Sequence, residues 1–270
     1  MNLSFKKIIK NLLPNFSKKI SNNFQYNSFK SRYKNFEEAN NLTTGYNSKK
    51  IKKKIEKAFK DSQKNSLLID RDAQIISKKN NNFRLINHIN NMIPSGKKSY
   101  AIDFGGSLGN FHRINKNYLK NNLIWIIFDK KEVIDIGKKY LKGEKFHFFS
   151  SIDLMTKFIK SRDIYINFFL FGSVLQYIDK IEKILKLVKS LNCKNIVIDR
   201  QPMLKIEKTS YSIQKVPFWN GASSFAVKLY NRRNFITILN KFDFYLIDSF
   251  KGFGDDFKNG GYYCKIFKKR

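Results

Sequence analysis

A glycine-rich turn is the feature of this chain whose residue types point most directly to ligand chemistry. A short apolar run ends at Asp103, and Gly105, Gly106, Ser107 and Gly109 follow within six residues. Glycine permits positive φ and lets a ligand approach where a Cβ would collide, so the pattern predicts a strand followed by a cofactor-binding turn. An ordinary tight turn between a strand and a helix is the alternative interpretation.

An acidic residue follows the next predicted strand. The run Leu123 to Phe128 is continuously apolar, which is typical of a parallel strand buried on both faces, and Asp129 comes twenty residues after Gly109. A carboxylate at this place can accept both ribose hydroxyls of a bound nucleoside. A solvated aspartate before Lys130 is the alternative, but the two linked features favour the ribose role.

Further polar side chains follow two more predicted strands. They are Ser173, Gln176 and Tyr177 after the strand predicted at 164–171, and Asp199 and Arg200 after the strand predicted at 195–199. Because ligands of open parallel sheets bind at the carboxyl ends of strands, we expect these residues beside the reacting groups. Asp199 is a candidate general base; a helix cap or an ion pair with Arg200 is an equal alternative. Gln176 and Tyr177 are candidate catalytic residues that could instead only close the turn.

The elements that position these residues alternate between strands and helices of about ten residues. This alternation predicts a parallel, doubly wound α/β sheet over 97–270. The runs 244–250 and 262–267 predict a terminal antiparallel hairpin. The connection 201–226 is too long for a plain link and predicts an insertion on the substrate side.

Two segments precede this domain. Residues 31–96 predict a helical cap, in which Asn47 or Ser48 begins a helix and Pro94 follows another. Residues 1–30 contain six lysines and no acidic residue, with apolar residues at roughly helical spacing. This pattern predicts an amphipathic segment that contacts an anionic membrane surface, with a locally docked N-terminus as the alternative.

The charge of the chain is strongly positive but does not indicate a specific nucleic-acid partner. Lysine and arginine total 53 against 21 acidic residues among 270, a formal net charge of +32. Only nine of the basic residues are arginine, and the lysines are spread along the whole length. We therefore expect nonspecific attraction to polyanions and no base-reading surface.

Cysteine and histidine are too few and too scattered to indicate a metal site. Cys193 and Cys264 provide neither a metal constellation nor a disulfide framework, which fits a reducing cytoplasm. The three histidines have no paired ligand spacing, so we expect no metal. No run of 18 apolar residues suggests a membrane-spanning helix.

Taken together, these strings resemble the class I S-adenosylmethionine (SAM) methyltransferases. The glycine turn is similar to their first motif, Asp-x-Gly-x-Gly-x-Gly, with one glycine shifted at Gly106-Ser107. More narrowly, the chain resembles a bacterial family of methyltransferases often encoded beside genes for cell-surface polysaccharides. The resemblance covers roughly residues 31–250 and is carried by Tyr33–Ala39, Gly45–Tyr46, Arg71–Asp72, Ile102–Gly109, Ser173–Tyr177, Ile198–Pro202 and Gln214–Pro217.

The resemblance implies a Rossmann-like sheet of seven strands, SAM as the cofactor, and methyl transfer to a saccharide or another small metabolite. It places the loop after the third strand against the adenine, so the candidates there are Ser151, Ile152 and Asp153. The candidates for contact with the methyl acceptor are Arg71, Arg200, Gln214 and Lys215. Arg71 could instead form an ion pair with Asp72 inside the cap.

The chain departs from the family pattern at two places, and two other function classes stay open. Asp129 stands where glutamate is expected, and Phe111-His112 stand where a tyrosine and a polar neighbour are expected. One alternative is a catalytically inactive SAM-fold scaffold. The other is a nucleic-acid methyltransferase. An amino-methylating DNA enzyme would have an Asn-Pro-Pro-Tyr-like string after the fourth strand, and this chain has Gly172-Ser173 there instead.

Overall fold

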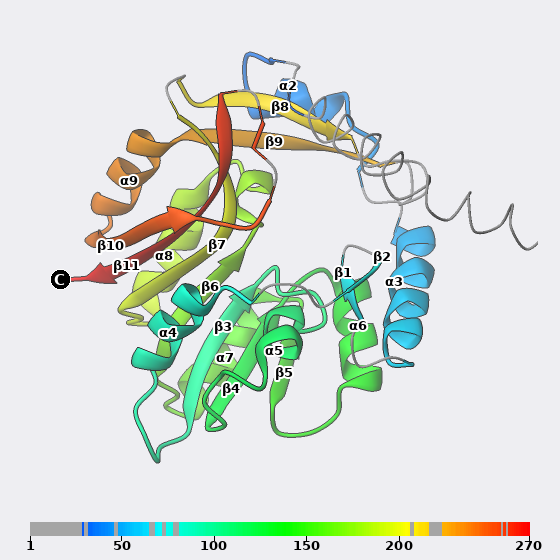
Figure 1. The fold of residues 1–270 in the computed structure, drawn as a ribbon, viewed down its shortest axis with the longest axis vertical. Helices are drawn as coiled ribbons and strands as arrows, with labels where there is room; N and C mark the ends of the chain where they lie inside the picture. Colours follow the sequence, from blue (N-terminus) through cyan, green and yellow to red (C-terminus); the bar gives the residue numbers. More distant parts are fainter. Residues whose placement is uncertain are drawn as a thin grey trace, which may run out of the picture.

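The computed structural model describes most of the chain from residue 32 onward (Figure 1). The described residues are 29, 32–45, 48–64, 68–71, 74–77, 81–205, 208–215, 223–254, 256–257 and 259–270. The membrane-contact prediction for 1–30 therefore lies outside the described residues, Phe29 excepted. Asp72 and the side chain of Arg71 lie outside them as well.

A nine-stranded sheet forms the centre of the molecule. Seven of its strands lie in the order β10-β11-β7-β6-β3-β4-β5, while β9 pairs with both β7 and β8. The strands are β3 (Ser99–Phe104), β4 (Leu123–Phe128), β5 (Phe146–Phe149), β6 (Ile166–Gly172), β7 (Asn195–Leu204), β8 (Ser210–Lys215), β9 (Ser224–Asn231), β10 (Phe244–Lys251) and β11 (Gly260–Lys269). The expected count of seven is therefore two short, because the predicted insertion 201–226 contributes strands that join the sheet.

The five strands from β5 to β7 are parallel, as the alternation of elements predicts. The sheet then changes direction: β11 pairs antiparallel with β7, and β10 pairs antiparallel with β11. Beyond Asp199, β7 continues for five residues to Leu204, where it meets β9. The first part of the predicted insertion is thus an extension of a central strand.

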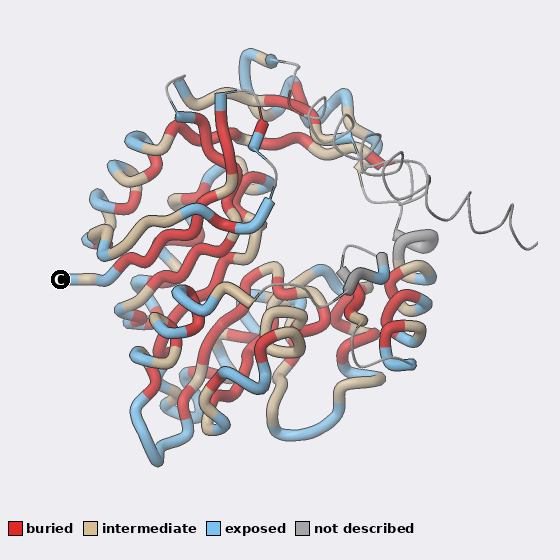
Figure 2. The backbone as a smooth tube through the Cα atoms, viewed as in Figure 1, coloured by how far each residue is buried: buried red, intermediate tan, exposed pale blue. Residues whose placement is uncertain are grey.

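Helices cover both faces of the sheet, so the parallel strands are buried on both sides (Figure 2). Along β3, Ala101 belongs to the core under α4, whereas Ile102 belongs to the core under α7, α8 and α9. This arrangement explains why Leu123 to Phe128 reads as an unbroken apolar run. The helices are α4 (Phe83–Asn91), α5 (Asn110–Asn115), α6 (Lys131–Tyr140), α7 (Ile152–Ser161), α8 (Ile181–Ser190) and α9 (Arg232–Asn240), with a 3-10 turn η1 (Leu175–Tyr177).

The segment before the sheet is less uniform than the predicted helical cap. Helices α2 (Phe36–Asn41) and α3 (Ser48–Ser62) are followed by a hairpin of β1 (Leu68–Arg71) and β2 (Gln74–Ser77). Helix α2 packs on β8 and β9 through Ala39, whereas α3 packs on α6 through Phe59 (Figure 1). One part of this region thus packs on the inserted strands, and the other packs on the side of the sheet that carries the glycine turn. Among the described residues, no helix is long and apolar enough to cross a membrane.

Candidate functional site

The carboxyl ends of β3, β4, β6 and the parallel part of β7 bring the predicted site residues to one edge of the sheet (Figure 1). Three residues that are not glycine have left-handed backbone there: Ser107 with φ 53°, Ser173 with φ 54° and Arg200 with φ 53°. Such conformations cost free energy and concentrate where function requires them. Ser107 and Ser173 follow β3 and β6, and Arg200 follows the parallel part of β7. The sequence predicts ligand contacts at all three of these strand ends.

Backbone hydrogen bonds join the glycine turn to the end of β4. The Gly105 amide donates to the Phe128 carbonyl at 2.7 Å, and the Ser107 amide donates to Asp129 Oδ2 at 2.8 Å. The Lys130 amide donates to Asp129 Oδ1 at 2.7 Å. A carboxylate has about four acceptor positions, so Asp129 can hold the turn and still accept ribose hydroxyls.

Each glycine of the turn lies against a different part of the fold. A Cβ on Gly106 would lie 2.4 Å from Asp103 Cγ, and one on Gly105 would lie 2.5 Å from Val174 Cγ2. A Cβ on Gly109 would lie 2.6 Å from the Phe146 ring. The turn is thus enclosed by β3, by the loop after β6 and by β5, and a larger residue would displace one of these neighbours.

Asp103 is the most unusual ionisable group at this edge. Its side chain is buried, with 2% of the residue exposed, and no hydrogen bond among the described residues reaches its carboxyl. Burial, followed by the nearby Asp129 and Asp199 carboxylates, raises the pKa of Asp103 to about 8, while Arg200 opposes the rise. Across the described chain, no group of three or more His, Cys, Asp or Glu residues is arranged to hold a metal ion.

Asp199 is engaged in the ion pair that the sequence offered as one alternative. Arg200 Nε donates to Asp199 Oδ2 at 2.9 Å, and Cys264 Sγ lies 3.4 Å from Asp199 Oδ1. Burial, followed by the Asp199 charge, raises the pKa of the Cys264 thiol, which stays protonated and can donate to the carboxylate. Asp199 is therefore held by neighbours on β7 and β11.

The loop after β6 connects the sheet to the inserted hairpin. The Ser173 amide donates to the Asp199 carbonyl at 2.9 Å, and Gln176 Nε2 donates to the Ser173 carbonyl at 2.7 Å. Tyr177 Oη donates to Gln214 Oε1 on β8 at 2.7 Å. Tyr177 and Gln214, two predicted residues from distant segments, thus meet, whereas Lys215 at the end of β8 is exposed.

The predicted adenine-side residues begin α7. Ser151 Oγ accepts from the Leu154 amide at 3.4 Å, so Ser151 is the N-cap of that helix. Ile152 is 37% exposed, and Asp153 is exposed as well. The Asp129 amide donates to the Phe149 carbonyl at 3.2 Å, which brings this loop beside the predicted ribose carboxylate. Ile152 thus gives this loop an exposed apolar side chain, which suits a nucleobase ring.

A buried ion pair that the sequence did not reveal supports the helix after the glycine turn. Arg113 on α5 contacts Asp70 on β1 with 2.7 Å between Nη1 and Oδ1, and Phe59 of α3 stacks on its guanidinium. Asp70 adjoins Arg71, the residue predicted to reach the site from the cap. The described side chain of Asp70 therefore links the cap to α5, the helix that follows the glycine turn.

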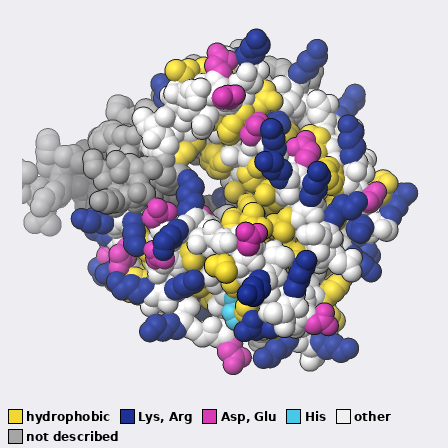
Figure 3. All heavy atoms as spheres, turned by 180° about the vertical axis from the view of Figure 1, so that it is seen from behind, with side chains coloured by type: hydrophobic (Ala, Val, Ile, Leu, Met, Phe, Trp, Pro, Cys, Tyr) yellow, Lys and Arg dark blue, Asp and Glu magenta, His cyan; other side chains and the backbone are white. Residues whose placement is uncertain are grey.

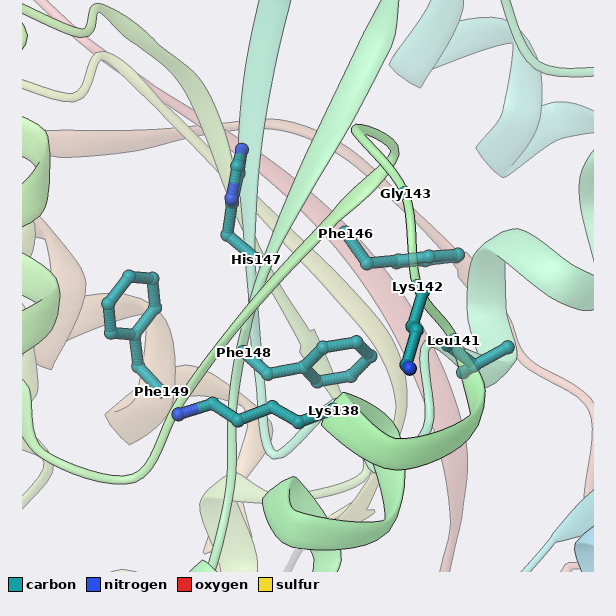
Figure 4. Close-up of a pocket in the computed structure, with 8 residues that line it drawn as sticks. All are labelled: Lys138, Leu141, Lys142, Gly143, Phe146, His147, Phe148 and Phe149. Carbon is teal, nitrogen blue, oxygen red and sulfur yellow. The ribbon is translucent and has the colours of Figure 1, made fainter.

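A hollow of about 440 Å³ lies along the sheet edge at β5 (Figure 4). Its lining consists of Lys138, Leu141, Lys142, Gly143 and Phe146–Phe149. None of the predicted site residues lines it, but two of its lining residues adjoin them: Phe146 lies against Gly109, and the Phe149 carbonyl accepts from the Asp129 amide.

Comparisons with known proteins find similar backbones but no close relative. No protein-family model matches the chain, and no curated protein does. Several solved structures with a similar backbone are methyltransferases. A SAM-dependent methyltransferase from Methanosarcina mazei is 12% identical with a TM-score of 0.48, over 68% of this chain and 96% of that one.

Two further solved structures have comparable scores. A 1,6-didemethyltoxoflavin-N1-methyltransferase from Burkholderia thailandensis is 12% identical with a TM-score of 0.45, over 69% of this chain and 76% of that one. LepI in complex with SAM is 13% identical with a TM-score of 0.47, over 69% of this chain. The alignment spans only 46% of LepI, less than half its length. The fold is defined by the order and direction of this chain's own strands.

Proposed function

We propose that this protein is a SAM-dependent methyltransferase. The observation that carries the proposal is the hydrogen bond from the Ser107 amide to Asp129, which joins a close-packed glycine turn to the carboxylate suited to a ribose. The sheet around it supports the proposal, because a parallel core that ends in antiparallel strands differs from the all-parallel nicotinamide-binding fold. The resemblance in sequence motifs points in the same direction.

The residues at this edge fit a nucleoside that carries a cationic amino-acid tail. The glycine turn offers backbone approach, Asp129 suits the ribose, and Ile152 presents an exposed apolar surface for adenine. Asp103 is a buried carboxyl without a donor among the described residues, as expected of a group whose partner is a ligand. When bound, SAM supplies a methyl group already activated by its positively charged sulfur.

The protein then has to hold the acceptor, exclude water and remove a proton where the acceptor is a hydroxyl or amine. The loop from Ser173 to Tyr177 covers the strand ends and, together with Gln214, forms the acceptor side of the site. Asp199 is the candidate base, and Arg200 keeps its carboxylate oriented. This orientation would place one anionic oxygen near the acceptor proton.

A glycan or another small metabolite of cell-surface polysaccharide biosynthesis is the acceptor class that we propose. The side chains on the acceptor side suit it: Tyr177 and Phe225 offer ring faces, with their centroids 6.0 Å apart, and Gln214 offers an amide. Basic side chains are dispersed over the face seen in Figure 3, which supports a small acceptor over a nucleic-acid strand. The two cysteines are free thiols, which supports a reducing, cytoplasmic location.

Calorimetric titration with SAM and S-adenosylhomocysteine tests the proposal. The wild-type protein should bind both saturably in enough salt to suppress nonspecific polyanion contacts, and Asp129→Ala should lose most of that affinity. Asp135→Ala, which removes a partly exposed aspartate from α6, is the matched control and should bind as wild type. A folded wild-type protein that binds neither ligand would contradict the enzyme and favour the inactive scaffold.

A further inference from the structure

Three carboxyl groups lie together at the carboxyl ends of β3, β4 and β7, and their partners differ. Asp129 accepts hydrogen bonds from the Ser107 and Lys130 amides, and Asp199 is paired with the Arg200 guanidinium. Asp103 has neither a cation nor a hydrogen-bond donor of its own among the described residues. Within the described part of the chain, Asp103 is therefore the one carboxyl of the three that no ion pair or hydrogen bond compensates.

Electrostatics assigns a proton to that uncompensated group. A buried carboxylate without a donor is costly, and two neighbouring anions increase the cost. Among the described residues, only Arg200 contributes positive charge near Asp103, and its Nε is already bound to Asp199. Protonation of Asp103 removes both the desolvation cost and the repulsion, whereas protonation of either neighbour would sacrifice an existing contact.

The proposed cofactor would change this balance. Its amino-acid tail ends in an α-ammonium, which keeps its three hydrogens at neutral pH and needs an anionic partner. Asp103 lies directly beneath the glycine turn, since a Cβ on Gly106 would lie 2.6 Å from Asp103 Oδ2. A cation admitted at this turn thus approaches the one carboxyl that lacks a partner.

We propose that Asp103 carries a proton in the free protein and that the cofactor's α-ammonium displaces it, so that each binding event releases one proton to the buffer. The inference rests on the proposed function, because it assumes that a SAM-like ligand binds at this turn. No bond in the ligand changes. The proton leaves the carboxyl oxygen for the solvent, and a carboxylate–ammonium pair replaces the neutral acid.

The sign of the resulting pH dependence follows from the two states. The pKa of Asp103 in the free protein is raised to about 8, so the free protein holds the proton at pH 7, and the ligand lowers that pKa. The bound state therefore holds fewer protons, and affinity must rise with pH. We expect the dissociation constant for S-adenosylhomocysteine to fall about tenfold from pH 6 to pH 7 and to level off above about pH 8.

Calorimetry at pH 7 in buffers of different ionisation enthalpy counts the released protons. Wild type should release close to one proton with S-adenosylhomocysteine, which prevents turnover. It should release none with 5′-methylthioadenosine, which lacks the amino-acid tail. Saturable binding without proton release would overturn this inference and leave the proposed function intact, whereas absence of binding would overturn the proposed function itself. If S-adenosylhomocysteine and 5′-methylthioadenosine released the same number of protons, the proton would come from the ribose contact. That result would overturn the role of the ammonium.

Two variants and a ligand-free readout complete the test. Asp103→Asn should bind more weakly, with no proton release and no rise in affinity with pH. Asp163→Asn, at an exposed turn before the opposite end of β6, should behave as wild type. Infrared difference spectra of the free wild-type protein should show a protonated carboxylic acid at pH 7 that titrates away near pH 8. The absence of that band would overturn the inference even if Asp103→Asn failed to fold.

Discussion

The two sides of the candidate site are built in different ways. On the glycine-turn side, a short stretch after β3 meets Asp129 through backbone hydrogen bonds, and each glycine is enclosed by packing. On the acceptor side, Tyr177 and Gln214 meet through side chains that are 37 positions apart in the chain, one on a loop and one on an inserted strand. The first side is fixed by the main chain, and the second by side chains at the surface.

This difference indicates which side can vary without loss of the fold. The enclosed glycines of the turn tolerate few substitutions, because an added Cβ would collide with a neighbour. Such a rigid turn suits a ligand of constant shape. Side chains on β8 and β9 can change while the parallel sheet stays intact, since β9 meets β7 over only two paired positions. We infer that the turn side specifies the cofactor and that the inserted hairpin specifies the acceptor.

The sharpest test of this division is Asp199→Asn. Loss of a general base should lower turnover by about 10² to 10⁴-fold, while the affinity for SAM stays close to wild type. Steady-state kinetics and calorimetry on the same preparation would measure both quantities. Turnover at the wild-type rate would remove Asp199 as the base and leave it only the ion pair with Arg200.

Removal of the buried support under the turn should have the next largest effect. Arg113→Ala removes the cation from the buried Asp70 carboxylate and leaves it the Ser62 hydroxyl, so we expect a loss of roughly 3 to 5 kcal/mol of unfolding free energy in urea. Arg162→Ala removes an exposed arginine that only stacks on Phe158 and serves as the control. If both variants lost a similar, small amount, α5 would not depend on the Asp70 pair.

A smaller loss, confined to the cofactor, is expected from Gly106→Ala. The added methyl group would overlap Asp103, and an overpacking cost of about 1 to 3 kcal/mol corresponds to roughly 5 to 160-fold weaker binding of S-adenosylhomocysteine. Gly172→Ala adds the same methyl group where no atom lies within 4 Å, so its affinity should stay near wild type. Equal affinities for the two variants would show that the turn is not closely packed in solution.

The mildest change is expected from Tyr177→Phe on the acceptor side. It removes one hydrogen bond to Gln214, worth about 0.5 to 1.5 kcal/mol, and should raise the KM for the acceptor by roughly 2 to 13-fold. SAM affinity should not change. If Tyr177→Phe weakened SAM binding as much as it raised the KM for the acceptor, the two sides of the site would not be distinct.

Most of the parallel sheet and the turn side could be predicted from the sequence, because both depend on short-range patterns. The run Leu123 to Phe128 is β4 to the residue, since burial on both faces requires an unbroken apolar string. Asp129 and the three glycines were identified because a strand end and a tight turn are local features. In the structure the Ser107 amide donates to Asp129, so the turn and this strand end lie together.

The sequence could not indicate which side chains meet across the fold. Asp70 and Arg113 form their pair across 43 positions, and no local pattern distinguishes Asp70 from its neighbour Arg71. From the sequence, the inserted segment was predicted only as a long connection, because its strands are defined by their pairing with β7 and with each other. Pairing partners of this kind depend on long-range contacts.

The sequence by itself thus determined the alternating α/β sheet, the glycine turn and the acidic strand ends, because apolar periodicity and backbone freedom act within a few residues. Only the tertiary structure decided that, of the three carboxyls Asp103, Asp129 and Asp199 at this edge, Asp103 alone has no partner among the described residues. The protonation of a buried acid depends on every charge and donor around it. Those neighbours come from strands far apart in the chain, so no stretch of sequence contains that information.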